Sequence, residues 1–225
     1  SGQFSVISAA SALGLSTQQL ASLGVNGSGT LGTSGLVYLS TSVFAALGLS
    51  QVQALTSTQV AYLSTVQLSA LGSGNIGQLA LEGLSTAQLV GLESADVAFL
   101  SSAAVSRLSS SQVGNLSEAQ IRALVSSNVA GLALSGLSTG KLSALDAEDF
   151  AGFSAEVLGG LSTQQVAALS SGQLRALVPG NITQLKVEGL NSANIVGLET
   201  ADLGALSSGQ FSVISAASAL GLSTQ

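Results

Sequence analysis

A leucine, or another large apolar residue in its place, returns every eight residues along most of this chain. One unbroken series runs from Leu84 to Leu132, and a second apolar residue, such as Leu89 or Val97, stands five residues after each member. The unit reads approximately L-S-T-x-Q-V-x-A. The apolar residues at positions six and nine are three apart and share a helical face, but position one does not continue that face. The chain is therefore expected to bend once in every eight-residue unit, which we call an octad.

The start of the octad predicts a short helix. Ser-Thr-x-Gln is a capping-box pattern, in which a hydroxyl accepts an early helix N–H and the Gln side chain reaches back to the cap. The pattern pairs Ser85 with Gln88, Ser109 with Gln112, Ser117 with Gln120, and Ser162 with Gln165. Each octad is predicted to form one to two helical turns joined by a corner of one or two residues. Because helices this short are unstable alone, they must bury Leu and Val against neighbours.

Shorter steps interrupt the octads. Four similar five-residue steps are expected at LALEGL, LALSGL, LKVEGL and LGTSGL, which begin at Leu79, Leu132, Leu185 and Leu31. Six octads plus five residues give a super-repeat of 53 residues. Six corners in one direction would close a loop, so we expect a repeat solenoid whose short helical turns lie in wide stacked coils of about 53 residues.

The interrupting segments differ from the octads. Leu79-Ala80-Leu81 alternates, and Gly83, Gly136 and Gly189 follow at the end of three of these segments. Such a pattern is typical of a short strand or extended corner, with glycine permitting unusual dihedrals. Stacked once per coil, these segments would form a narrow parallel β ladder. The alternative is a β-solenoid throughout, but the recurring Gln-Val-x-Ala-Leu favours helix, and 53 residues would make a long β coil.

The two ends of the chain are copies of each other. Residues 1–18 read SGQFSVISAASALGLSTQ, and residues 208–225 repeat these letters at an offset of 207. Three coils of 53 residues and one of 48 give the same period. We therefore expect one continuous solenoid segment over residues 1–225, with coils over about 36–83, 84–136, 137–189 and 190–225, the last continuing into a copy of 1–35. A tandem array longer than this chain is the expected parent.

The composition leaves little room for chemistry. The chain has no His and no Cys, so His-based triads, thiol nucleophiles and thiolate metal sites are excluded, and we expect no enzymatic activity. Five basic residues against a net charge of −6 make nucleic acid an implausible partner. Polar residues interrupt every apolar run, so membrane insertion is not expected. The expected partner is the chain itself, through a long array or lateral association.

Acidic residues recur at the 53-residue spacing. Two such rows are Glu93, Asp146 and Glu199, and Asp96, Asp149 and Asp202. In stacked coils of 53 residues they would form vertical rows of carboxylates, which could bind Ca²⁺ between coils; no other cofactor is expected. The alternative is helix capping, because an acid in the first turn satisfies N–H groups and the helix dipole. Asn75, Asn128 and Asn181 recur likewise, and a turn or cap role is favoured over an internal stack.

The runs LSTQQVAAL, LSTAQLVGL and LTSTQVAYL, which begin at Leu161, Leu84 and Leu55, resemble the low-charge LSTxQVxAL repeats of very large secreted bacterial surface proteins, including adhesins and extracellular fibre proteins. The resemblance implies an extracellular or cell-surface location and a passive structural role. The leading hypothesis is the repeat unit of a bacterial extracellular filament, ribbon or sheath that assembles by coil stacking and lateral packing. The alternative is the stalk of a large adhesin whose binding domain lies elsewhere.

Overall fold

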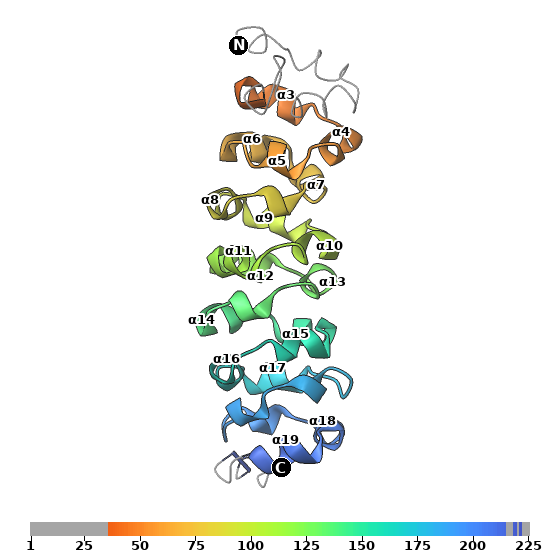
Figure 1. Ribbon diagram of the computed structural model, residues 1–225, viewed down its shortest axis with the longest axis vertical. Helices are drawn as coiled ribbons and strands as arrows, with labels where there is room; N and C mark the ends of the chain where they lie inside the picture. The colour runs from red at the N-terminus through yellow and green to blue at the C-terminus, as the bar shows by residue number, and fades with distance from the viewer. Residues whose placement is uncertain (1–35, 215–217, 220, 222–225) are drawn as a thin grey trace. The chain divides into compact units, whose positions relative to one another are not determined.

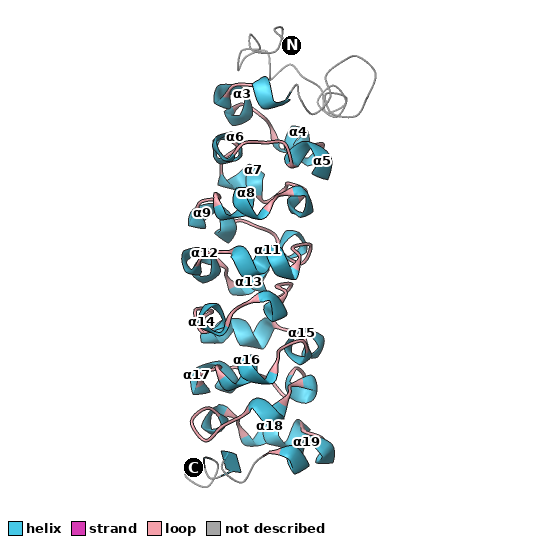
Figure 2. Cartoon of the chain, turned by 60° about the vertical axis from the view of Figure 1, so that its left-hand side comes forward, coloured by secondary structure: helices cyan, strands magenta, loops and turns pink. Residues whose placement is uncertain are grey.

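The computed structural model of the chain describes residues 36–214, 218–219 and 221. Its backbone contacts divide into two compact units, Ser1–Leu108 (unit 1) and Ser109–Gln225 (unit 2). In the described part of both units the regular elements are short α-helices and 3-10 helices, and none is a β-strand (Figure 2). None of these helices has the length and apolar character needed to span a membrane.

Unit 1 is built from α-helices separated by corners, with a 3-10 turn (η) at two places. Its elements are η1 (Leu36–Tyr38), α3 (Thr41–Ala45), α4 (Leu49–Gln53), α5 (Ser57–Val60), α6 (Thr65–Ala70), α7 (Ser73–Ile76), η2 (Leu81–Gly83), α8 (Thr86–Val90), α9 (Ser94–Ala98) and α10 (Ser102–Val105).

Unit 2 continues the same pattern with more 3-10 turns. Its elements are α11 (Ser110–Asn115), α12 (Glu118–Ala123), α13 (Ser126–Val129), η3 (Leu134–Gly136), α14 (Thr139–Leu142), η4 (Ala147–Gly152), α15 (Ala155–Gly159), α16 (Thr163–Ala167), α17 (Ser171–Arg175), η5 (Ile182–Gln184), η6 (Val187–Gly189), η7 (Ile195–Gly197), α18 (Thr200–Ala205) and α19 (Ser208–Val213).

Each octad forms one short helix and one corner, as the sequence predicts. All four predicted capping boxes are present, at the starts of α8, α11, α12 and α16. Two extended residues make the corner: Leu116 has φ −55° and ψ 140°, and the N-cap Ser117 has φ −70° and ψ 160°. The leucine at position one and the apolar residue at position six are buried, as in Leu124 and Ile121. The prediction of a helical octad is therefore confirmed.

Elements that lie three segments apart along the chain pack against each other, where a segment is an octad or a five-residue step. In unit 1, α3 contacts α6, α4 contacts α7, and α5 contacts η2. In unit 2, three columns follow the same rule: α11, η3, α15, η5 and α18; α14, α16, η6 and α19; and α13, η4, α17 and η7. Within each unit the chain thus completes one turn in three segments (Figure 1).

The predicted coil of 53 residues does not occur in either unit. Side-chain hydrogen bonds between successive turns join residues that are only 23 to 31 positions apart, as in Ser73 to Asp96 and Gln173 to Leu142. The reason is the sharp corner, which follows only three to six helical residues and changes the chain direction at every octad. The 53-residue period contains six octads and one five-residue step, so it spans seven segments, or two turns and a third.

The five-residue steps replace one octad as a side of the turn, and they are not strands. The 3-10 turns η2, η3 and η6 occupy the steps that begin at Leu79, Leu132 and Leu185. The predicted β ladder is therefore absent from the described residues. Most of the fourth predicted step, residues 31–36, lies outside the described residues. Its last residue, Leu36, begins η1. Since Leu31 and Leu39 are eight residues apart, Leu36 stands at position six of an ordinary octad and does not start a new one.

The glycines of these steps have a different role from the one predicted. Among the described glycines only Gly72 has a positive φ, so Gly83, Gly136 and Gly189 are not required for a left-handed conformation. They are required for close approach: a Cβ at Gly136 would lie 2.2 Å from the carbonyl oxygen of Ser110 in the preceding turn. Glycine therefore lets the short side of the turn lie directly on the backbone beneath it.

Candidate functional site

The most distinctive chemical feature of the molecule is a polar side chain buried at position five of the octad. Every buried polar or charged residue in the described part of the chain stands at this position. The set is Gln59, Gln67, Gln88, Asp96, Gln112, Gln120, Asn128, Asp149, Gln165, Gln173, Asn181, Asn194, Asp202 and Ser218. No buried side-chain nitrogen or oxygen among the described residues lacks a hydrogen-bond partner. Position five is therefore a polar track inside an otherwise apolar core.

Gln165 shows how the track works. Its Oε1 accepts the backbone N–H of Ser162 at 2.8 Å, which caps its own helix α16. Its Nε2 donates to the carbonyl oxygens of Leu134 at 3.0 Å and Leu137 at 2.8 Å, which belong to the preceding turn. One amide group thus caps a helix start and donates to two carbonyls of the preceding turn, of which Leu134 O also accepts the N–H of Leu137.

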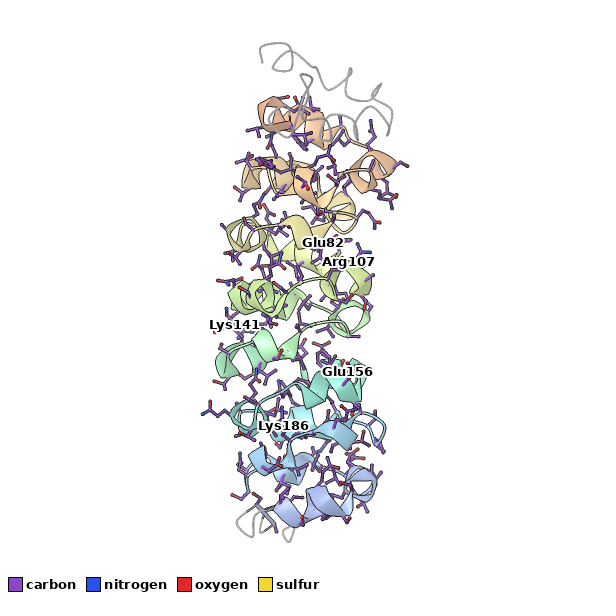
Figure 3. All side chains as sticks on the ribbon, viewed as in Figure 1. Glu82, Arg107, Lys141, Glu156 and Lys186 are labelled. Carbon is purple, nitrogen blue, oxygen red and sulfur yellow. The ribbon has the colours of Figure 1, made fainter. Side chains whose placement is uncertain are left out.

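Other residue types perform the same function at position five. In unit 2, Asn194 donates to Val166 O at 3.0 Å and Ser218 donates to Leu190 O at 2.7 Å. Lys141, labelled in Figure 3, donates through Nζ to Gly114 O at 2.6 Å. The common requirement is a hydrogen-bond donor that can reach a carbonyl of the preceding turn, and the side-chain length can vary.

The recurring asparagines belong to this track. Asn181 accepts the N–H of Val178 and donates to Phe150 O, both at 2.9 Å, and Asn128 accepts the N–H of Val125 at 2.9 Å. In unit 1, Asn75 donates to Leu47 O and Leu71 O, each at 3.1 Å. The favoured cap role is therefore correct for Asn128 and Asn181. The amide nitrogen of Asn75 and Asn181 also joins two turns, which the 53-residue spacing does not predict.

An ionised aspartate at position five cannot donate. In unit 1, Asp96 accepts the N–H of Glu93 at 3.2 Å, and Ser73 of the preceding turn donates its hydroxyl to Asp96 at 2.8 Å. In unit 2, Asp202 accepts the N–H of Glu199 at 3.1 Å, but Pro179 occupies the position that corresponds to Ser73. Burial raises the pKa of Asp202 above its ordinary value of 3.8. The hydrogen bond from the Glu199 N–H lowers this pKa in part, and the negative charge of the Glu199 carboxylate raises it further.

The substitution Asp202→Asn is expected to raise the stability of the chain at neutral pH by about 1 kcal/mol, since the amide regains a donor. Because the folded-state pKa of Asp202 lies above 3.8, the carboxyl lowers the free energy of unfolding at neutral pH. This cost disappears as the pH falls through the folded-state pKa towards 3.8. Melting temperatures measured from pH 7 to pH 4 should therefore rise less on acidification in the variant than in the parent.

A second substitution separates the two causes. Pro179→Ser supplies the hydroxyl that Asp96 receives from Ser73, and it should weaken the pH dependence while leaving the carboxyl in place. Equal pH slopes in the parent and in Asp202→Asn would contradict this account of Asp202.

Within unit 2 the structure does not bring the predicted calcium residues into rows. Asp146 and Asp149 flank the start of η4, which packs against α13 and α17, whereas Glu199 and Asp202 lie at the start of α18, which packs against η5. They stand on different sides of unit 2 because 53 residues span seven segments and not a whole number of turns. In unit 1, Glu93 and Asp96 lie at the start of α9. No group of three or more acidic residues in the described part could hold a metal ion.

The capping alternative agrees with what Asp96 and Asp202 do, because each accepts the backbone N–H at the start of its own helix. The capping-box pattern predicts the cap at position five but not the bond to the preceding turn. The signal was present: a polar residue of varying type recurs directly before the buried apolar residue at position six, as in Lys141-Leu142 and Asn194-Ile195.

Comparison with known proteins agrees with the repeat character of the chain. Residues 89–133 and 142–179 match the family model of the ALTTAQ repeat. No characterised protein and no solved structure matches the chain. Over these two stretches, therefore, the sequence is similar to the ALTTAQ repeat, and the chain is a tandem-repeat protein with a helical repeat structure.

Proposed function

We propose that this chain is a structural repeat unit: a segment of a bacterial extracellular filament, ribbon or sheath that assembles by stacking of its turns. The observation that carries the proposal is the polar track at position five. In both units the buried side chains of this track are used to bond one turn to the next, as Gln88 bonds to Leu63 and Gln165 to Leu137. The role proposed is mechanical, with no catalysis, cofactor, nucleic acid or membrane insertion.

The length of the repeat supports a continuous array. The 207-residue period contains 24 octads and three five-residue steps, which makes 27 segments. If the rule of three segments per turn holds through the whole chain, the period closes after nine complete turns. Successive 207-residue copies would then begin on the same side of one continuous solenoid. Each side of the solenoid would therefore present the same residues at a regular interval along the axis.

The extracellular assignment comes from the likeness of the LSTxQVxAL runs to secreted surface proteins, and the absence of Cys, Met and Trp suits an oxidising environment.

One observation favours the second candidate, a single stalk that carries an adhesive domain elsewhere. The most exposed apolar side chains of unit 1 stand on different sides of the turn: Val66 on the side of α6, Phe99 on that of α9, and Tyr62 on that of α5. In the described part of unit 1, residues 36–108, these side chains therefore do not form a single apolar face for lateral packing.

Electron microscopy of a protein made of several 207-residue copies tests the proposal. We expect a regular rod with a stacking repeat of about 8–10 Å between turns and an axial repeat of about 70–90 Å for nine turns. Ordered side-by-side bundles would support the filament or sheath, and separate rods would support the stalk. An irregular thread without an axial repeat would refute both.

A further inference from the structure

The residue at position five depends on the kind of segment that lies three segments earlier. Within each unit, every described octad that is stacked on another described octad carries a polar residue at this position. These residues are Gln67, Asn75, Gln88, Asp96, Lys141, Asp149, Gln165, Gln173, Asn181, Asn194, Asp202 and Ser218. The apolar residues Ala104 and Val157 stand at position five of octads that lie three segments after the steps with η2 and η3. Val43 is apolar as well, but the segment beneath it lies outside the described residues.

The carbonyl at position one explains this difference. In the three described steps it already accepts the backbone N–H two residues later, each at 2.9 Å: Leu79 O from Leu81, Leu132 O from Leu134, and Leu185 O from Val187. No backbone N–H of the described residues donates to the position-one carbonyls of the octads at Leu137 and Leu145. These carbonyls accept the side-chain amides of Gln165 at 2.8 Å and Gln173 at 3.0 Å instead. Because a buried carbonyl needs a partner, an octad requires a donor above it and a step does not.

Val157 shows the arrangement above a step. Its helix α15 packs against η3, and Ser154 Oγ accepts the N–H of Val157 at 3.2 Å, so the helix start is capped without a polar side chain at position five. The carbonyl 25 positions earlier, the separation between Gln210 and its acceptor, is that of Leu132, which is already bonded within the step. Gln210 above η6 shows that a donor is tolerated over a step, where it adds a second bond to one carbonyl.

Asp96 meets the same requirement in another way. An ionised carboxylate cannot donate, but the carbonyl 25 positions earlier, Leu71 O, accepts the side-chain amide of Asn75 at 3.1 Å. The residue that corresponds to Asn75 beneath Asp202 is Asn181, whose amide nitrogen donates to a different turn. This difference agrees with the destabilising effect expected of the Asp202 carboxylate.

We propose that position five sets the register in which the turns stack, because Ala104 and Val157 admit only a five-residue step beneath them. The inference rests on the proposed structural function and adds what fixes the alignment of the turns. Loss of the octad 145–152, for example, would place Val157 above an octad and Gln165 above a step. The octad carbonyl would then lack a donor, so the shifted register is less stable than the native one.

Exchange of the segment beneath Val157 tests this register. In the full-length chain, residues 132–136 are replaced by a second copy of residues 161–168, which turns the step into an octad and keeps the number of segments. Since the new position-one carbonyl has no donor above it, the equilibrium constant for folding should fall about tenfold. Adding Val157→Gln should restore this constant to within about threefold of the parent chain. Urea titration followed by far-UV circular dichroism measures both changes.

Val157→Met is the matched control, because methionine has nearly the length of glutamine but no N–H group. In the replaced chain it should restore little of the lost stability. In the parent chain, Val157→Gln should change the folding constant by less than about threefold. Equal effects of Val157→Gln and Val157→Met in the replaced chain would mean that position five contributes only packing, which would overturn the proposal. A replaced chain that is as stable as the parent without Val157→Gln, or that fails to fold with it, would overturn it too.

These measurements separate the inference from the proposed function, because they use single chains and the microscope images assembled repeats. Rescue by Val157→Gln together with irregular threads would support the register and refute the filament. Regular rods together with equal effects of Val157→Gln and Val157→Met would leave the structural role standing and refute the register.

Discussion

The substitution Gln165→Ala should lower the free energy of unfolding by about 2–4 kcal/mol. It removes the acceptor for the N–H of Ser162 and the donor to the carbonyls of Leu134 and Leu137. Because Gln165 is 7% exposed, water has little access to groups left without a partner, and their desolvation is not compensated. Urea titration followed by far-UV circular dichroism measures the change.

The adjacent residue provides the control. Gln164 lies in the same helix but is exposed, and Gln164→Ala keeps the helix-forming character of the site. That variant should change the free energy of unfolding by less than about 0.5 kcal/mol. Similar losses in the two variants would mean that the amide matters only for helix propensity. The bond between turns would then contribute little.

The second large effect is expected from Gly136→Ala, which should destabilise unit 2 by about 3 kcal/mol. The added methyl group would lie 2.2 Å from Ser110 O, and the nearby Ser110 carbonyl carbon and Cα at 2.8 Å leave it no room. These are backbone atoms, so η3 and α11 must move apart, which also strains the apolar contacts on both sides. Thermal unfolding should show a lower melting temperature, and hydrogen exchange should show faster exchange in both elements.

Gly140→Ala is the matched control, because this glycine lies four residues later in α14 with no atom within 4 Å of the added Cβ. Alanine is the better helix former, so this variant should gain about 0.5–1 kcal/mol. Opposite signs for the two substitutions would establish that Gly136 is needed for contact between turns. A neutral Gly136→Ala would show that the turns separate without cost.

The local structure could be predicted from the sequence, and the size of the turn could not. The Ser-Thr-x-Gln pattern specifies a helix start through a bond within four residues, so Ser162 and Gln165 can be paired from spacing alone. The angle of each corner depends on the ψ values of residues such as Leu116 and Ser117, which no spacing encodes. Six corners were expected to close a coil, whereas three segments do so.

For the same reason, only the local part of the site, the helix cap, could be predicted from the sequence. Capping by Gln165 follows from the sequence, but its bond to Leu137 depends on which residue lies beneath it in the preceding turn. Once the turn was expected to take 53 residues, the acidic residues were expected to align, and the calcium rows followed. The observed turn places Asp149 and Asp202 on different sides. The glycine steps were likewise assigned to unusual dihedrals, because close approach to Ser110 is not visible in a sequence.

The three-segment turn constrains how the length of such an array can change by recombination between its repeats. Loss or gain of three octads removes or adds one turn and leaves every later side in its place. Loss of a single octad would shift every later segment by one side, a third of a turn. A glycine such as Gly136, which needs the backbone of the preceding turn close beside it, would then lie against a different segment. A five-residue step counts as a full side, so exchange of a step for an octad changes the length without such a rotation. Length variants that remain folded and aligned should therefore differ by whole multiples of three segments.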